Sequence, residues 1–416
     1  MLNKFGGISN ITPPILFCIN KVLKIMTTII KPRIQSIDLL KGLVMVLMAL
    51  DHVRDYFHYS AFFFDATDPT QTTLPIFFTR FITHFCAPAF SFLAGTSAFM
   101  IGKRKPINEL SSFLFKRGLW LIFVEIIIIN FAWKFDLNFT HIGLQTIWSL
   151  GISMIVLAGL IYLPKKVILI FSVVIIFGHN LLDSIQFDGS YLWSMFHEPQ
   201  KFEFTEGHTV IFAYSILPWI AVMSLGYCFG SLYDTTFDIE KRKLILNSLG
   251  IGSFILFIIL IAFNTYGNPV KWTNYVDISK TIMSIFNVNK YPPSLLYLLI
   301  TLGGTFLFLA NAEKLKGKVV DFFCVFGRVP FFYYILHLYL IHLIAIFAAE
   351  FTGFGWQIMV SMPTFVTRVE ALKGYGFNLI TVYIIWIIVI LLLYPLCKKF
   401  DNYKQNHKEE WWLSYL

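Results

Sequence analysis

The stretch IDLLKGLVMVLMALDHVRDYFHY, residues 37–59, joins an apolar run long enough to cross a bilayer to a dense group of ionisable side chains. A transmembrane helix needs about 20 predominantly apolar residues. A charged side chain at the bilayer centre costs about 2.5–3.5 kcal/mol on insertion scales, so such residues usually face other helices or water-filled cavities. The stretch therefore predicts a membrane helix whose last turns are either an interfacial anchor or part of a functional site.

The same apolar pattern recurs along the whole chain. Of the 416 residues, 57% are hydrophobic and only 14% are charged, whereas about 25% of the residues of a soluble globular protein are charged. We therefore predict an all-α, polytopic membrane protein, with one membrane domain over residues 33–400 and a tail over residues 401–416. Ten transmembrane helices are expected, at residues 37–59, 76–101, 112–133, 145–163, 167–183, 209–232, 244–264, 293–312, 328–349 and 378–396.

Basic residues gather in alternate loops of this predicted arrangement. The N-terminal segment and the loops after every second span carry several lysines and arginines, while loops 60–75 and 184–208 together hold only Lys201. The positive-inside rule then places both termini in the cytoplasm. This distribution also accounts for the net charge of +9, so no nucleic-acid partner is expected. Residues 1–32 are expected to be a cytoplasmic or interfacial segment, unless translation starts at Met26.

Two residues of the first span lie on one face of the predicted helix. Lys41 and His52 are eleven residues apart, which is three turns plus about 20° and about 16 Å along the axis. One face of the helix therefore offers an ammonium near the cytoplasm and an imidazole deeper in the membrane. We favour a functional role for His52 over a structural one.

Other polar residues lie close together at the end of the first span: Asp51, Arg54, Asp55, Tyr56 and His58. Residues three or four apart are neighbours on a helix. Asp55, or a residue of another helix, is therefore a better candidate than Asp51 for a carboxylate that orients His52. An ion pair between Asp51 and Arg54 that anchors the helix end explains those two residues equally well.

Two later spans carry buried polar residues. In the second span, Pro88 lacks the N–H that would bond the carbonyl of His84, so a kink is expected beside this histidine. In the third span, Glu125 and Asn130 are five residues apart, about 140° around an α-helix, and are expected to point in different directions. Interhelical hydrogen bonds are the simplest role for both, and an ion pair of Glu125 with a cation of another span is the alternative.

The ninth span contains the stretch GRVPFFYYILHLYLIHLIA, residues 327–345. Tyr333 and His337 are neighbours at i and i+4, and Arg328 lies at the predicted cytoplasmic end. A buried histidine bonded to tyrosine or backbone is the structural alternative to a functional one. No span holds two histidines at i and i+4, HExxH is absent, and the five cysteines are scattered. We therefore expect neither a metal site nor a disulfide framework.

Several stretches resemble one family of membrane proteins. They are RIQSIDLLKGLVMVLMALDH (33–52), HFCAPAFSFLAG (84–95), LPWIAVMSLGYCFG (217–230), KYPPSLLYLLITLG (290–303), FGRVPFFYYILHLYLIH (326–342) and YIIWIIVILLLYPLC (383–397). Over about residues 33–400 the chain resembles bacterial membrane proteins related to the catalytic domain of lysosomal heparan-α-glucosaminide N-acetyltransferase. The resemblance implies a transmembrane acyltransferase of the bacterial plasma (inner) membrane.

The spacing of Lys41 and His52 also resembles a motif of the acyltransferase type 3 proteins, in which a basic residue precedes a histidine by the same interval. That resemblance implies His52 as the catalytic base and Lys41 as a contact of the acyl donor. Aligned with the lysosomal enzyme, however, the reactive histidine falls nearer to His58. The resemblance therefore leaves His52 and His58 as alternative bases, with Asp55 as the carboxylate beside them.

Both arguments predict acyl transfer across the membrane. The implied co-substrate is acetyl-CoA or another acyl-CoA, with no cofactor bound permanently, and its phosphates suit a cytoplasmic basic rim of Lys41, Arg117 and Arg328. The acceptor is expected to be a carbohydrate-like hydroxyl or amine that meets loops 184–208 and 265–292 on the external side. Candidate donors to the oxyanion are Tyr56, Asn130 and His337.

Two further functions fit the same polar residues. A multi-pass transporter also uses buried ionisable groups and proline-broken spans, and a membrane redox protein would use histidine ligands. Membrane lipid is a partner in each case, and a homodimer is one form in which the protein is expected to assemble.

Overall fold

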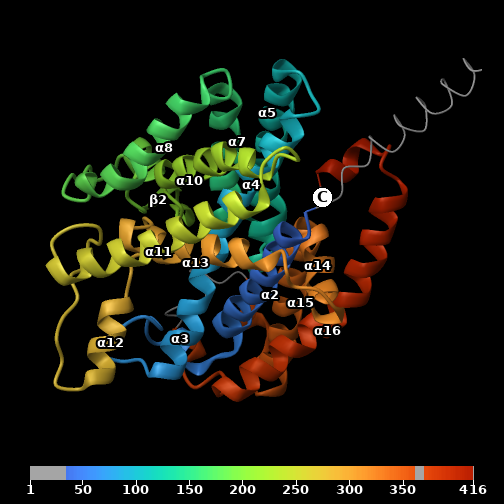
Figure 1. Cartoon of the computed structure of the whole chain (residues 1–416). Helices are drawn as coiled ribbons and strands as arrows, with labels where there is room; N and C mark the ends of the chain where they lie inside the picture. Colours follow the sequence, from blue (N-terminus) through green and yellow to red (C-terminus); the bar gives the residue numbers. More distant parts are fainter. Residues whose placement is uncertain (1–33, 361–369, 416) are drawn as a thin grey trace, which may run out of the picture. The chain divides into compact units, whose positions relative to one another are not determined.

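The computed structural model describes residues 34–360 and 370–415 of the chain. Residues Ser36–Leu416 belong to one compact unit, which is predominantly helical (Figure 1). The all-α expectation is therefore confirmed for the described residues, apart from one small sheet. The segment expected over residues 1–32 lies outside the described residues.

The elements follow one another along the chain with short connections. The helices that precede strand β2 in the sequence are α2 (Gln35–Phe57), α3 (Leu74–Ile82), α4 (Cys86–Gly102), α5 (Ile107–Val124), a π-helix (Glu125–Ile129), α6 (Asn130–Lys134), α7 (Thr146–Leu160), α8 (Lys165–Gly178) and α9 (Tyr191–Phe196). The helices that follow strand β3 are α10 (Ile216–Phe229), α11 (Ile239–Phe263), α12 (Ile278–Phe286), α13 (Leu295–Ala312), α14 (Lys318–Arg328), α15 (Pro330–Phe351) and α16 (Leu379–Asn406). The strands are β1 (His141–Leu144), β2 (Lys201–Thr205) and β3 (His208–Phe212).

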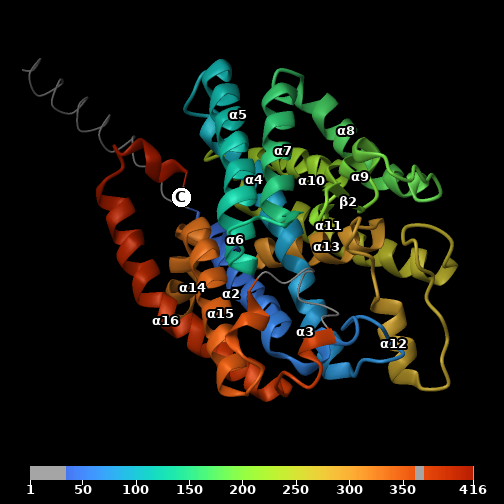
Figure 2. The same ribbon diagram turned by 180° about the vertical axis from the view of Figure 1, so that it is seen from behind.

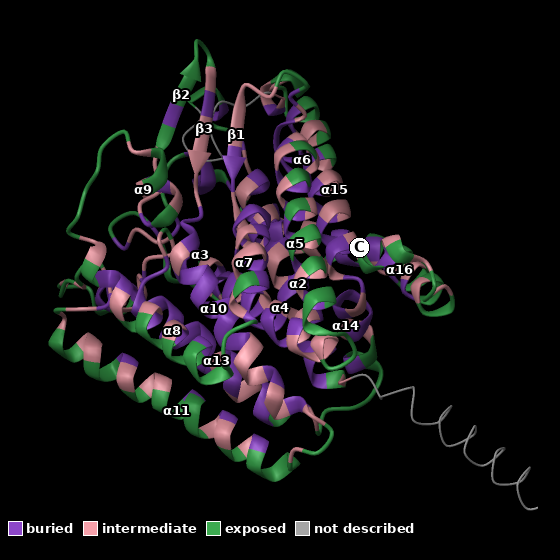
Figure 3. Cartoon of the chain, turned by 90° about the horizontal axis from the view of Figure 1, so that it is seen from above, coloured by how far each residue is buried: buried purple, intermediate pink, exposed green. Residues whose placement is uncertain are grey.

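Seven helical segments of the described residues are long and apolar enough to cross a membrane, which identifies an integral membrane protein. They are Leu74–Gly102, Lys165–Leu182, Ile216–Tyr233, Ile239–Phe263, Leu295–Ala312, Pro330–Phe351 and Leu379–Asn406. The other three expected spans are also helical: they correspond to α2, to α5 with α6, and to the shorter α7. Large apolar side chains stay exposed along α8, α11 and α16 (Figure 3), as expected of surfaces that meet lipid.

The three strands form a sheet in the order β1-β3-β2 that the sequence did not predict. Strand β3 pairs in parallel with β1 and antiparallel with β2. The expected sixth span, residues 209–232, therefore begins too early, because residues 208–212 are a strand and α10 begins at Ile216. The apolar run of β3 is too short for its periodicity to separate a strand from a helix.

Helix α2 is enclosed by helices from distant parts of the chain (Figures 1 and 2). The hydroxyl of Tyr56 donates to the backbone oxygen of Trp133 in α6 at 2.6 Å. The indole N–H of Trp386 in α16 donates to the backbone oxygen of Val46 at 2.8 Å. Contacts with α6 and α16 therefore fix the position of α2 inside the unit.

The first half of α2 crosses α14 at very close range. A Cβ atom at Gly42 would lie 1.8 Å from the carbonyl oxygen of Phe323, and one at Gly327 would lie 1.8 Å from that of Asp38. Only glycine permits such an approach of two backbones. This crossing fixes where along α14 the helix α2 lies, and so where its charged end falls.

The second predicted span is interrupted where the kink was expected. Helix α3 ends at Ile82, a 3-10 turn covers Thr83–Phe85, and α4 begins at Cys86. Pro88 cannot donate to the carbonyl of His84, and the hydroxyl of Tyr297 in α13 donates to that oxygen instead, at 2.8 Å. The break redirects the chain between α3 and α4 and gives both helices a side chain on the same cavity.

Candidate functional site

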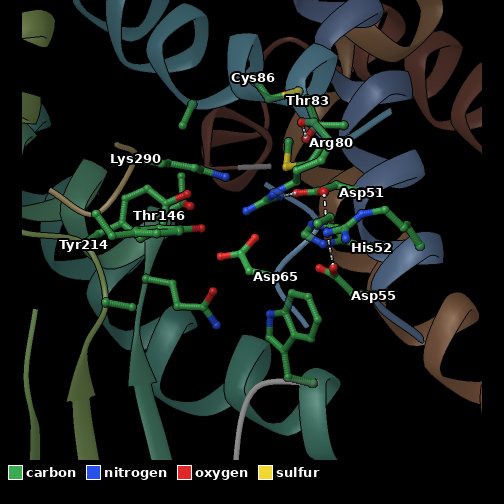
Figure 4. A pocket seen from close by; sticks show the side chains of 18 of the residues that line it. Asp51, His52, Asp55, Asp65, Arg80, Thr83, Cys86, Thr146, Tyr214 and Lys290 are labelled. Atoms are coloured by element: carbon green, nitrogen blue, oxygen red, sulfur yellow. Dashed lines mark hydrogen bonds and ion pairs between the residues drawn. The ribbon is translucent and has the colours of Figure 1, made fainter. Parts of the chain in front are cut away.

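A cavity of about 550 Å³ lies beside the charged end of α2. Polar and charged side chains from α2, α3, α7, α15 and the connections between elements line it (Figure 4): Asp51, His52, Arg54, Asp55, Asp65, Arg80, Thr83, Gln145, Thr146, Tyr214, Lys290, Tyr291 and Tyr334. Apolar or sulfur-containing side chains complete the wall: Met48, Phe64, Ala66, Cys86, Ala87, Phe90, Trp133, Pro199, Ile211 and Ala213. The volume is that of a typical small-ligand site.

Four charged residues form a chain of ion pairs along one wall. Asp51 lies between two guanidinium groups: its Oδ1 is 3.2 Å from Arg54 Nη2, and its Oδ2 accepts from Arg80 Nη1. The same Arg54 nitrogen lies 2.5 Å from Asp55 Oδ1. Asp51 and Arg54 are 6% and 5% exposed, so their charges are removed from bulk water and require these partners. The predicted pair of Asp51 and Arg54 is therefore present, as part of a larger network.

The imidazole of His52 lies at the wall of the cavity, next to this network. Its ring meets the indole of Trp133 edge-on at a centroid distance of 4.8 Å and stacks on the ring of His337 at 5.2 Å. Neither ring nitrogen has a hydrogen-bond partner among the described residues. Asp55, the carboxylate expected to orient it, pairs with Arg54 instead. Ring stacking therefore orients His52 and leaves its nitrogens for a ligand.

The neighbouring histidine, His337, is fixed by its own backbone turn. Its Nδ1 lies 3.0 Å from the carbonyl oxygen of Tyr333, so this nitrogen donates and carries the proton. Its ring also stacks on that of Tyr333 at 5.1 Å, with an angle of 5° between the planes. The predicted neighbours Tyr333 and His337 thus form a rigid backing for His52.

Lys290 and Tyr214 lie across the cavity from Asp51 and His52 (Figure 4), and Tyr291 also lines the cavity. Lys290 hydrogen-bonds with the phenol of Tyr291, whose ring lies 5.2 Å from the ammonium nitrogen, and the ring of Tyr214 meets that of Tyr291 edge-on at 5.3 Å. Burial by itself lowers the pKa of the Lys290 amine. The oxygens of Tyr214 and Tyr291 raise it more, so the pKa lies above its ordinary value and the amine is charged at neutral pH.

The second candidate base, His58, lies outside the lining of the cavity. It is buried, its Nδ1 is 2.6 Å from the hydroxyl of Ser60, and it caps the 3-10 turn Tyr59–Phe62. Its backbone pairs with that of Phe377. The structure thus gives His58 a local capping role and brings His52, rather than His58, to the cavity.

Each of the three basic residues expected to bind the acyl donor has a different hydrogen-bond partner. Lys41 Nζ donates to Ser97 Oγ of α4 at 2.9 Å. Arg117 donates to the backbone oxygen of Ser414 near the end of the chain, and Arg328 Nε donates to Asp401 Oδ2 at 2.6 Å. Among the described residues, none of these three basic side chains lines the cavity. Of the three, Lys41 shares a helix with the cavity, because Met48 lines it about two turns further along α2.

Glu125 and Asn130 make structural hydrogen bonds. Glu125 Oε2 accepts from the backbone N–H groups of Ile147 and Trp148 at 2.9 and 3.0 Å, and so caps the start of α7. Asn130 exchanges two hydrogen bonds with the backbone of Gly143, at 2.6 and 3.0 Å, and its amide also donates to the backbone oxygen of Glu125 at 2.7 Å. The expectation that these residues point in different directions is wrong, because residues 125–129 form a π-helix, which aligns positions five apart.

The two remaining predicted residues are buried beside the cavity rather than in its lining. Tyr56 donates its hydroxyl to the backbone of Trp133 and stacks on the ring of His342 at 5.0 Å. The ring of His84 meets that of Tyr297 at 5.4 Å. Both residues therefore support elements that carry the lining.

The prediction missed the residues that other elements bring to α2: Arg80, Lys290, Tyr214, Asp65 and Gln145. A signal existed for two of them. Arg80 lies inside an apolar span, and Lys290 precedes an apolar span on the side where the positive-inside rule leaves few basic residues. No sequence signal distinguishes Asp65, Gln145 or Tyr214 from ordinary loop residues.

No group of three or more metal-ligating side chains is found among residues 34–360 and 370–415.

The model of one protein family matches this chain. The family is described as heparan-alpha-glucosaminide N-acetyltransferase, catalytic, and the match covers residues 33–261, just over half of the chain. It includes Asp51, His52 and Arg80, whereas Lys290 and His337 lie beyond it. No curated protein matches the chain.

Proposed function

Because the chain belongs to the heparan-α-glucosaminide N-acetyltransferase catalytic-domain family, a family of membrane acyltransferases, we propose that it transfers an acyl group from cytosolic acyl-CoA to an acceptor on the other side of the membrane. The donor is acetyl-CoA, and the acceptor is a carbohydrate-like hydroxyl or amine. His52 is the general base. The family match gives no support to the transporter alternative.

One observation carries this proposal: an imidazole with two unengaged nitrogens lies at the wall of a cavity large enough for the reacting ends of two substrates. General bases must reach the proton that they remove, within about 2.6–3.2 Å. Because His52 lines the cavity, we propose that a ligand seated there comes within this range of its imidazole, and the stacking on His337 and Trp133 holds its ring in place. His58 has no comparable access, so we choose His52 between the two.

We place the entry of the donor between α2 and α4. Met48 of α2 and Cys86 and Phe90 of α4 all line the cavity. Further along these helices, the ammonium of Lys41 bonds Ser97, which links the same pair of helices. An acyl-pantetheine arm that starts at Lys41 would cover about 16 Å to reach His52. Lys41 would then contact a CoA phosphate.

The acceptor enters from the side of the sheet. Loops 184–208 and 265–292 contribute Pro199, Lys290 and Tyr291 to the cavity. Gln145 lines the same cavity, and its amide nitrogen is buried and has no hydrogen-bond partner among the described residues. A donor of this kind would stabilise the oxyanion of the tetrahedral intermediate.

The chemistry balances with these groups alone. Neutral His52 accepts the proton of the acceptor hydroxyl or amine as its oxygen or nitrogen forms a bond to the thioester carbonyl carbon. The tetrahedral oxyanion then collapses, the C–S bond breaks, and the imidazolium returns the proton to the departing thiolate. The products are the acylated acceptor and CoA thiol.

This reaction needs the topology that the sequence predicts. Ten spans with both termini in the cytoplasm would place Lys41 on the cytosolic side and the end of α2 toward the external side. The plasma membrane of a bacterium, where acyl-CoA is available on one side only, suits this arrangement.

The test is turnover of acetyl-CoA by the purified full-length protein in lipid nanodiscs. We expect His52→Ala to lower the rate of CoA release by a factor of about 100 or more, because one general base contributes about 10²–10⁴ in rate. His58→Ala is expected to stay within about threefold of the wild type. Equal losses in both variants, or loss in His58→Ala alone, would contradict the choice of His52.

A control separates loss of the base from loss of the fold. His337→Phe keeps an aromatic ring against His52 but removes both nitrogens. If His52 is the base and His337 only backs it, this variant retains most of the activity at an unchanged melting temperature.

A further inference from the structure

A further cavity, of about 400 Å³, lies beyond the end of helix α8. Helix α9 and the residues on either side of it supply most of its lining. Large apolar side chains make up most of the wall, and Ser190, Trp193 and His197 are its polar members. Among the described residues, this lining shares no member with that of the cavity beside His52. The two cavities are therefore separate sites.

The apolar part of the wall is open to the outside of the protein. Phe187, Leu192 and Phe196 line the cavity and are between 41% and 68% exposed. Leu182, which also lines it, is the last residue of the apolar span Lys165–Leu182. Large apolar side chains along that span are exposed, as expected of a surface that meets lipid. The cavity thus begins where a lipid-facing helix ends, and an acyl chain can reach it from the bilayer.

Two buried polar atoms belong to side chains of this wall. Nδ1 of His197 and Nε1 of Trp193 are both shielded from solvent, and neither has a hydrogen-bond partner in the part of the chain that the structure describes. The His197 residue as a whole is 2% exposed. Burial of a polar atom without a hydrogen bond is unfavourable, so a ligand in the cavity is expected to supply the missing partners.

The ion pair of His197 determines which partner its Nδ1 needs. Nε2 of this ring lies 3.0 Å from Asp183 Oδ1. Because an ionised carboxylate only accepts hydrogen bonds, Nε2 carries the proton, and in the neutral ring Nδ1 is then an acceptor. The indole Nε1 of Trp193 is always a donor. A single hydroxyl group satisfies both atoms: it donates its proton to Nδ1, and its oxygen accepts from Nε1.

Hydrogen bonds hold both side chains in place before any ligand arrives. Asp183 Oδ2 accepts from Asn180 Nδ2 at 2.8 Å, and Asn180 Oδ1 accepts from the backbone N–H of Leu295 at the start of α13, also at 2.8 Å. Ser190 Oγ accepts from the backbone N–H of Trp193 at 3.2 Å. A site that is ordered in advance binds its ligand at a lower entropic cost.

We propose that this cavity binds a membrane lipid that carries a free hydroxyl group beside its acyl chains, such as a diacylglycerol. The chains pack on the apolar wall, and the hydroxyl bonds Nδ1 of His197 and Nε1 of Trp193. The occupant is a lipid rather than a soluble alcohol because the exposed apolar lining continues the lipid-facing surface of α8. This site does not depend on acyl transfer in the other cavity.

The test compares two lipids that differ in one group: 1,2-dioctanoylglycerol and its 3-O-methyl ether, in which the hydroxyl is capped. Their binding to the full-length protein in detergent at pH 8 is titrated by native mass spectrometry. We expect the wild type to bind the free alcohol about fivefold or more tightly than the ether, because the ether cannot donate to Nδ1 of His197 and leaves it unpaired.

Two substitutions separate the acceptor from the donor. His197→Phe removes the acceptor and keeps a ring, so the ratio of the two affinities should fall to within about twofold. His197→Asn, whose side-chain oxygen can replace Nδ1, should retain most of the ratio. Trp193→Phe removes an N–H that the oxygens of both lipids can accept, so it should weaken both lipids about equally and leave the ratio unchanged.

A matched control comes from the same short helix. Tyr191→Phe removes a hydroxyl of α9 outside the cavity lining and should change neither affinity. Equal binding of both lipids by the wild type, or an unchanged ratio in His197→Phe, would overturn the proposal.

Two other occupants are distinguished by competition. Displacement of the lipid by an equal concentration of glycerol, which has hydroxyls but no chain, would show that the cavity takes a soluble alcohol. Tighter binding of dioctanoyl phosphatidic acid than of dioctanoylglycerol would show that Nδ1 donates to an anion. Either result would overturn the proposal, and neither depends on turnover of acetyl-CoA.

Discussion

The two halves of helix α2 differ in how closely they pack against their surroundings. Near Asp38 and Gly42 the helix touches α14 backbone to backbone, with no room for a single methyl group at Gly42 or Gly327. From Met48 to Asp55 the same helix borders a cavity of about 550 Å³ and carries charged side chains that need partners. One end is therefore close-packed and the other is hollow.

This difference shows how a membrane helix can carry so many ionisable residues. The cost of their burial is offset by ion pairs between Asp51 and two arginines, and by a cavity that admits polar ligands. The close-packed half fixes the position of the helix, so that the hollow half presents His52 at a defined place. Close packing at one end of α2 thus positions the reactive side chain at the other end.

The largest expected effect comes from filling the close-packed end. In Gly327→Val the new Cβ would lie 1.8 Å from the backbone oxygen of Asp38, so α2 and α14 would have to separate. We expect a loss of more than about 3 kcal/mol of stability, seen as loss of monodisperse protein after purification. Gly252→Val, in α11, is the matched control, because a Cβ atom there would meet no other atom within 4 Å, and it should change stability by less than about 1 kcal/mol.

A smaller effect is expected from breaking the ion pairs at the hollow end. Arg80→Met leaves the buried carboxylate of Asp51 with Arg54 as its remaining partner, and should lower stability by about 2 kcal/mol. In the double variant with Asp51→Asn, the unpaired charge is gone, so the combined loss should be smaller than the sum of the single losses. Thermal unfolding of the four proteins measures this coupling, and simple additivity would contradict the network.

The smallest effect is expected at Lys41, which lies in the close-packed half of α2. If its ammonium meets a CoA phosphate, Lys41→Met should raise the KM of acetyl-CoA about three- to tenfold, as loss of one solvent-accessible charge-assisted bond allows. The KM of S-acetylpantetheine should not change. Lys166→Met, which removes an exposed lysine at the start of α8, serves as the control, and an equal rise in that variant would remove Lys41 from the donor site.

The helical architecture could be predicted because apolar length is a local property. Each of the ten expected spans corresponds to a helical segment in the structure, and the break beside Pro88 appears where the missing N–H requires it. The sheet could not be predicted, because β3 is a five-residue strand, HTVIF, whose short apolar part lies next to a helix, and its partner β1 is more than 60 residues earlier in the chain. The π-helix at Glu125 was missed because α-helical geometry was assumed throughout.

Only those residues of the site that lie on helix α2 could be predicted from the sequence. The spacing of residues in α2 gave His52, Asp51 and Arg54, which the structure brings to one cavity. Arg80 and Lys290 reach the cavity from α3 and from the turn before α13, and only tertiary structure brings them together. Asp55 was expected to orient His52, but Arg54 competes for it at 2.5 Å, an outcome that helix spacing alone leaves open.

The most direct test of the central claim asks whether CoA occupies the cavity beside His52. Met48 lines the cavity one turn before His52, so a cysteine in its place reports on occupancy. The variant Met48→Cys is made after replacing the five native cysteines with alanine, and its rate of reaction with a small maleimide is measured with and without acetyl-CoA.

We predict that saturating acetyl-CoA slows labelling of Met48→Cys about tenfold or more, while labelling of Thr70→Cys, in an exposed loop outside the lining, is unchanged. Labelling of Met48→Cys at the same rate with and without acetyl-CoA, in protein that binds acetyl-CoA, would show that the thioester does not reach this cavity and would contradict the account.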